Sequence, residues 1–153
     1  MNRTDTASVA RRIVDANMYM TIATADEDGR PWVSPVWFAR ASDAEFLWVS
    51  SPDARHSRNI ACRPEIAIVI FDSTVPVGVA EALYVEAVAE QVSSEDVGEA
   101  IPTYSRRSQA CGGRAWDAAD VLPPAAFRLY RAIAASQFVL GPRDERLPVK
   151  VDT

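Results

Sequence analysis

Short strand-like segments joined by tight turns run through most of this chain, and they constrain its fold more than any other feature. Residues 18–25 and 31–40 are rich in β-branched and aromatic side chains, and the turn-forming sequence Asp-Glu-Asp-Gly separates them. Residues 80–92 alternate as a half-buried strand does, and further strands are predicted at residues 45–49 and 65–72. Residues 127–140 are expected to form one bent strand or two short ones. Hairpin order predicts an antiparallel β-barrel, and the lack of regular strand–helix alternation argues against a doubly wound sheet.

Three helices are expected beside these strands. The first covers residues 5–16, and a third, which Pro102 could kink, covers residues 94–108. The second is predicted to start at Ser-Ser-Pro-Asp, residues 50–53, and to run to about Arg63, because Pro64 disfavours helix in the residue before it. The chain is therefore expected to form one mainly β domain over residues 1–153 with flanking helices, and a partly mobile tail at residues 141–153.

Charge and motif content exclude several classes of function. A formal net charge of -5 argues against a protein that coats nucleic acid, because such binding depends on many lysines and arginines. No apolar run is long enough to cross a bilayer and the first residues lack a signal-peptide core, so we expect a cytoplasmic protein. Two cysteines far apart and a single histidine offer no metal site.

Motifs of nucleotide-binding, hydrolytic and metalloprotease enzymes are missing from the sequence, and no residue is predicted to be catalytic. Any redox reactivity would therefore come from a bound cofactor.

The sequence SSPDARHSRN, residues 50–59, is the best candidate for an anion site. Arg55, Arg58 and Asn59 follow the expected helix start at helical spacing, and free amides with guanidinium groups suit a phosphate monoester. The alternative is a solvated helix face with ordinary caps. His56 could donate to the same phosphate when protonated, or could be an exposed helix residue. Nearby aromatic residues could wall a flat ring or belong to the core, namely Trp32, Trp37, Phe38 and Trp48.

Residues 29–72, GRPWVSPVWFARASDAEFLWVSSPDARHSRNIACRPEIAIVIFD, resemble the core of the pyridoxamine 5'-phosphate oxidase-like flavin-binding family. Residues 82–92 and 127–132 are similar to later strands of that family, so the resemblance covers most of the chain. It implies an antiparallel split β-barrel of Greek-key type that pairs as a homodimer with FMN held between the subunits.

The resemblance also implies cofactor-binding residues. Phosphate contacts fall on the end of the third strand and on the helix after it, at Ser50, Ser51, Arg55, His56, Arg58 and Asn59. Contacts to the flavin ring fall on the second strand, at Ser34, Val36 and Trp37.

These features predict an FMN-binding flavoprotein, an oxidoreductase of unknown small-molecule substrate. A deazaflavin (F420)-dependent reductase on the same barrel and a non-catalytic flavin-binding module are the alternatives. The chain departs from the family at two places: His56 stands where many relatives have lysine, and the late region has no histidine for a substrate phosphate.

Overall fold

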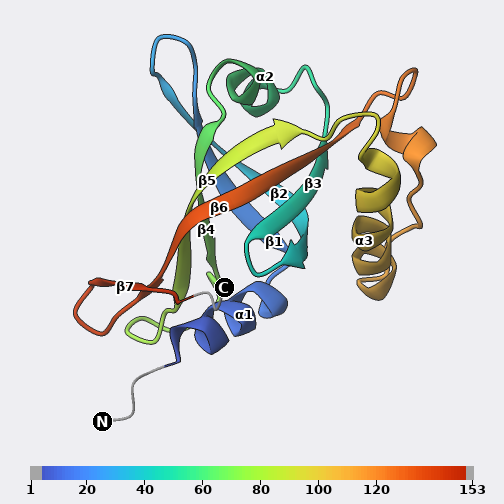
Figure 1. The fold of residues 1–153 in the computed structure, drawn as a ribbon. Helices are drawn as coiled ribbons and strands as arrows, with labels where there is room; N and C mark the ends of the chain where they lie inside the picture. Colours follow the sequence, from blue (N-terminus) through green and yellow to red (C-terminus); the bar gives the residue numbers. More distant parts are fainter. Residues whose placement is uncertain (1–4, 151–153) are drawn as a thin grey trace.

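Six antiparallel strands close into a barrel in the computed structural model, which describes residues 5–150 (Figure 1). The strand order is β3-β2-β1-β4-β5-β6-β7, and an additional pairing of β3 with β6 closes the barrel while β7 extends the sheet beyond β6. The strands are β1 (Tyr19–Ala25), β2 (Pro31–Ser42), β3 (Glu45–Ser50), β4 (Glu65–Phe71), β5 (Ala82–Gln91), β6 (Arg128–Leu140) and β7 (Arg146–Pro148). The fourth strand returns beside the first after a three-strand meander, so the predicted Greek-key barrel is confirmed.

The first hairpin shows why the sequence turns where it does. Gly29 adopts a φ of +84°, and the Asp26 carboxylate accepts hydrogen bonds from the backbone amides of Asp28 and Arg30. Pro35 lies opposite Thr21 of β1, but β3 pairs with β2 only from Phe38 onward. The missing amide of Pro35 therefore costs the β2–β3 ladder no hydrogen bond.

Alternating side chains fill the barrel. Leu83, Val85, Ala87 and Ala89 of β5 are all buried, as the pattern of residues 80–92 predicts. The same core cluster contains several of the largest side chains with almost no solvent exposure, namely Trp48, Phe46, Met20, Ile22 and Ile70.

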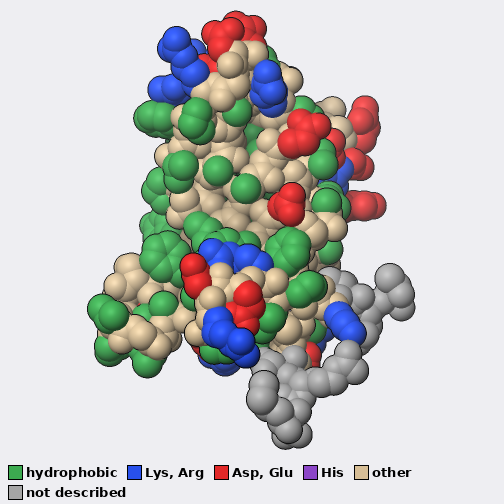
Figure 2. Space-filling model, turned by 90° about the vertical axis from the view of Figure 1, so that its left-hand side faces the viewer, with side chains coloured by type: hydrophobic (Ala, Val, Ile, Leu, Met, Phe, Trp, Pro, Cys, Tyr) green, Lys and Arg blue, Asp and Glu red, His purple; other side chains and the backbone are tan. Residues whose placement is uncertain are grey.

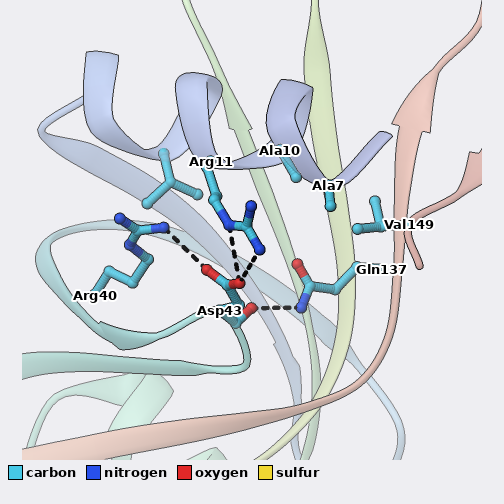
Figure 3. Close-up of a pocket in the computed structure, with 8 residues that line it drawn as sticks. Ala7, Ala10, Arg11, Arg40, Asp43, Gln137 and Val149 are labelled. Carbon is cyan, nitrogen blue, oxygen red and sulfur yellow. Dashed lines mark hydrogen bonds and ion pairs between the residues drawn. The ribbon is translucent and has the colours of Figure 1, made fainter. Parts of the chain in front are cut away.

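Helix α1 (Thr6–Ala16) lies against one end of the barrel, with Asp5 as its N-cap and Ala10, Ile13 and Val14 buried. Arg11 ties α1 to the β2–β3 turn, because the Asp43 carboxylate accepts hydrogen bonds from Arg11 at 2.9 and 2.7 Å and from Arg40 at 3.1 Å (Figure 3). The side-chain amide of Gln137 on β6 donates to the Asp43 carbonyl at 2.7 Å. The hydrogen bond from Arg11 is the main reason that the pKa of Asp43 is lowered.

Helix α3 (Val97–Ala110) covers the outer face of β2, β3 and β6 and forms a second apolar cluster there with the short 3-10 helix η1 (Ala118–Val121). Pro102 lies inside α3 without ending it, and the helix continues to Ala110. The predicted start at residue 94 is three residues early, since Asp96 is the N-cap.

One further prediction needs correction. The second helix does not start at residues 50–53: Ser50 is the last residue of β3, where it pairs with Arg128, and α2 comprises Arg55–Cys62. The tail at residues 141–153 includes β7, whose residues pair with Phe138–Leu140, and its mobility stays a prediction; residues 151–153 lie outside the described part. Among residues 5–150, no helix is long and apolar enough to span a membrane.

Candidate functional site

The candidate site lies where β3 ends and α2 begins, over one end of the barrel (Figure 1). The turn between them is held by Ser51, whose hydroxyl accepts from the Asp53 amide at 3.1 Å and whose carbonyl accepts from the Ser57 hydroxyl at 2.7 Å. The N-cap of α2 is Ala54, which has no side-chain acceptor, and the first turn contains no acidic residue. The first amides of α2 are therefore without a side-chain cap, which suits an anion from outside the chain.

His56 and Ser50 form a buried pair at this turn. The Nε2 atom of His56 lies 2.9 Å from the Ser50 hydroxyl, and both side chains are only 9% exposed. Burial lowers the pKa of His56 below its ordinary value of 6.5. His56 is therefore not the exposed helix residue that one alternative expected, and its imidazole is mainly neutral near pH 7.

Arg55 supplies the positive charge of the site. Its side chain is exposed, and its guanidinium carbon lies 4.2 Å above the centre of the Trp32 ring on β2. No carboxylate of residues 5–150 forms an ion pair with it. The pKa of Asp26 is lowered mainly by the hydrogen bond from the Arg30 backbone, and the charge of Arg55 is the smallest contribution. The guanidinium is thus oriented by an aromatic ring while its charge stays available to a ligand.

Arg58 and Asn59 do not join Arg55, although the helical spacing groups the three residues. The Asn59 side chain is buried and its amide donates to the Thr24 hydroxyl at 3.0 Å, so it fastens α2 to β1. Arg58 lines a different groove, beside β5 and β6. The three residues of the predicted phosphate-binding face therefore have different surroundings: Arg55 lies over Trp32, Asn59 is buried against β1, and Arg58 faces the groove beside β5 and β6.

The three predicted residues of β2 lie on opposite faces of the strand. Ser34 is half-buried and Val36 is buried, and both share the inward parity of Phe38. Trp37 points outward and meets the edge of the Tyr104 ring on α3, with 5.2 Å between the ring centres. Burial is the main reason that the pKa of Tyr104 rises to about 12, so this phenol stays protonated.

The remaining aromatic residues of the prediction are also divided. Trp48 is fully buried and stacks on Tyr130 with 5.8 Å between the ring centres, so the core alternative holds for it. Trp32 is 40% exposed and stands under Arg55, at the candidate site. The sequence left open whether Trp32 walls a ring site or belongs to the core, and its position places it at the candidate site.

An apolar groove on the outside of β1, β4 and β5 was not predicted. It has a volume of about 430 Å³, and its lining includes Thr21, Val33, Ala67, Tyr84 and Phe138. Figure 2 faces this side of the barrel, where uncharged side chains cover most of the middle of the molecule. The available signal was the nearly continuous apolar run of residues 65–71, because a strand with one solvated face would alternate with polar residues.

Fold and site together define a small antiparallel barrel in which the third strand leads into a helix start that has no side-chain cap. The sequence profile described as pyridoxamine 5'-phosphate oxidase matches residues 8–133, and the chain belongs to that family. A search of curated proteins finds no match to the sequence.

Solved structures with the same fold bind or act on different groups, as their descriptions state. A heme-binding protein from Mycobacterium smegmatis is 21% identical with a TM-score of 0.76, and the alignment covers 97% of this chain. A heme storage protein from Vibrio cholerae is 24% identical with a TM-score of 0.69, covering 86% of this chain and 92% of that one. An F420 reductase is 21% identical with a TM-score of 0.57, covering 78% of this chain and 88% of that one.

The chain spans only 59% of the length of the Mycobacterium smegmatis protein. At these identities the likeness shows the fold alone.

Proposed function

We propose that this protein binds FMN with the phosphate at the first turn of α2, and that it uses the flavin as an oxidoreductase on a small molecule. The observation that carries the proposal is Arg55, an exposed guanidinium held over Trp32 beside helix amides that have no side-chain cap. Arginine binds phosphate through two parallel donors, and a helix start adds amide donors and a favourable dipole.

The residues of the turn fit a phosphate monoester. Ser50 and His56 form one polar pair and the Ser51 hydroxyl already orders the turn, so a ligand meets groups that are fixed before it binds. The neutral imidazole of His56 contributes a hydrogen-bonding group and not a full charge. Arg55 therefore carries most of the positive charge that a phosphate would meet.

The flavin would supply hydride or electron transfer when bound, and the chain would supply its position and the exclusion of water. Trp37 and Val33 are apolar groups on the outward face of β2, the strand that pairs with β3. Val33 is 58% exposed in the single chain, so a flat ring over this face would cover apolar surface.

A second copy of this chain is the proposed partner. Tyr19 of β1 and Phe71 of β4 are 60% and 47% exposed, on the two strands that also line the apolar groove. Large apolar patches on soluble proteins mark interaction sites, and a twofold axis would let the same patch cover itself. A homodimer would also give the flavin ring a second wall.

Heme and deazaflavin are the competing ligands, because proteins of the same fold are described as heme-binding, as heme-storing and as an F420 reductase. The chain has a single histidine, and its Nε2 atom is engaged by Ser50 inside the turn. A histidine-ligated heme would have to break this pair, whereas a phosphate-bearing flavin would use the turn as it stands.

Titration of the purified protein with FMN, riboflavin, a deazaflavin and hemin tests the proposal. We expect FMN to bind well and riboflavin, which lacks the phosphate, to bind more weakly. Equal affinity for FMN and riboflavin, or a clear preference for hemin, would overturn the assignment of the phosphate site.

Catalysis needs a separate measurement, which is anaerobic reduction of the FMN-loaded protein by NADH or NADPH followed by re-oxidation with electron acceptors. We expect the flavin to be reduced and to pass its electrons on. Protein that binds FMN but is never reduced would be a flavin-binding module and not an oxidoreductase.

A further inference from the structure

A second groove, whose lining does not include Trp32, lies between α2 and the ends of β5 and β6. Its volume is about 440 Å³, and its apolar lining includes Ile60, Pro64 and Ala89. The Ala89 amide donates to the Pro64 carbonyl at 2.8 Å, so the exit of α2 is fixed to β5 and the walls of the groove hold their spacing. A groove of this size is within the range of small-molecule sites.

Polar groups without protein partners line the same groove. Arg58 is exposed and forms no ion pair or hydrogen bond through its side chain within residues 5–150. Gln91 is exposed beside it, and Tyr130 lines the groove although only 3% of its surface is exposed. Within the described part of the chain, the phenol of Tyr130 has no hydrogen-bond partner, so a cation, an amide and a phenol border an apolar floor.

The one acid of this lining is already paired. Glu90 accepts from the Arg131 Nε atom at 2.8 Å, on the side of β6. Glu90 therefore does not compensate the charge of Arg58, while its own carboxylate in the lining disfavours a doubly charged phosphate.

We propose that this groove binds a small organic carboxylate with a flat apolar body, held by Arg58 and Tyr130 over the apolar floor. A guanidinium and a carboxylate match as a two-pronged pair, and the apolar floor would cover the rest of the ligand. Arg55 contacts Trp32 of β2 and Arg58 faces β5 and β6, so the site does not depend on a bound flavin.

Benzoate is the probe, with neutral benzamide as its isostere, and the indole resonance of Trp48 is the reporter because Trp48 stacks on Tyr130. We expect benzoate to shift this resonance saturably in the millimolar range and benzamide to shift it far less. Arg58→Ala should weaken benzoate binding about ten-fold or more, as the loss of a charged contact does. Tyr130→Phe, which keeps the ring, should weaken it a few-fold.

Arg55→Ala separates this groove from the phosphate site, since it should leave the benzoate titration unchanged. The proposal is wrong if benzoate produces no saturable shift, if Arg58→Ala binds it as the wild type does, or if Arg55→Ala is the variant that loses it. A result in which FMN does not bind but benzoate still depends on Arg58 would refute the proposed function and leave this site standing.

Discussion

Replacement of Arg55 by alanine should weaken FMN binding and leave riboflavin binding almost unchanged. A hydrogen bond to a charged group contributes about 1.5 to 3 kcal/mol, which corresponds to roughly a ten-fold to hundred-fold loss of affinity. Arg55 has no carboxylate partner in residues 5–150, so its removal leaves no buried charge behind. The loss should therefore come from the ligand contact alone.

The stability cost of this change is small by the same geometry. Within residues 5–150 the guanidinium has one close contact, with the Trp32 ring at 4.2 Å, and an exposed cation–π contact is worth about 0.5 to 1 kcal/mol. In a chain of this length that corresponds to a shift of about 1 to 4 °C in Tm. Arg55→Lys keeps the charge without the two-pronged geometry and should fall between wild type and alanine.

Fluorescence titration of FMN and riboflavin into wild type, Arg55→Ala and Arg55→Lys makes the measurement. Arg63→Ala, at the other end of α2, is the matched control, because this arginine donates to the Glu27 carbonyl at 3.0 Å and lies away from the first turn. Equal losses for FMN and riboflavin would show that Arg55 shapes the ring pocket or the fold. Unchanged FMN affinity would show that Arg55 does not contact the phosphate and that this helix face is an ordinary solvated surface.

Three more outcomes are expected. Val33→Asp places a charge in the apolar groove and should convert the proposed homodimer into a monomer, as measured by light scattering. Val88→Asp, at an exposed position outside the groove, should leave the dimer intact. A wild-type protein that is monomeric across micromolar concentrations would refute the proposed interface. Because burial lowers the pKa of His56, the folded state resists protonation, and the free energy of unfolding should fall as pH drops below 6.5 toward that lowered pKa. His56→Gln should lack this dependence in urea titrations, and a wild type as flat as the variant would contradict it. The protein should not oxidise pyridoxamine phosphate efficiently, since its late region has no histidine, and turnover of about 1 per second or more would contradict this.

Strand positions and the closed antiparallel topology follow closely from the sequence, because local signals agree with one another. The Asp-Glu-Asp-Gly turn, the alternation in β5 and the position of Pro35 all reflect short-range chemistry that the barrel preserves. Alternation along one strand is set by the two faces of the pleat, so Leu83 and its inward neighbours could be identified without the rest of the sheet.

Residues whose placement depends on distant partners were harder to predict. Asn59 has the spacing of a surface residue beside Arg55, but its amide donates to Thr24, 35 positions earlier in the chain. Val36 is adjacent to Trp37 and faces the interior because β2 pairs with β1 in a register that places Ser34 opposite Ile22. Neither pairing leaves a signal in the local sequence. The family resemblance could therefore point to Asn59 and Val36, but it could not tell that their side chains pack inside the protein.

The start of α2 shows how a small error in an element boundary changes the interpretation of a site. Ser-Ser-Pro-Asp favours a turn and a helix start equally well, and pairing of Ser50 with Arg128 on β6 decides for strand followed by turn. A helix starting at residues 50–53 would carry Asp53 in its first turn, where a carboxylate competes with an incoming anion for the amides. With the start at Arg55 the first turn has no acid, and its N-cap, Ala54, has no acceptor. The observed start at Arg55 thus strengthens the case for an anion at α2, because it leaves Asp53 outside the first turn and the first amides of the helix without a side-chain partner.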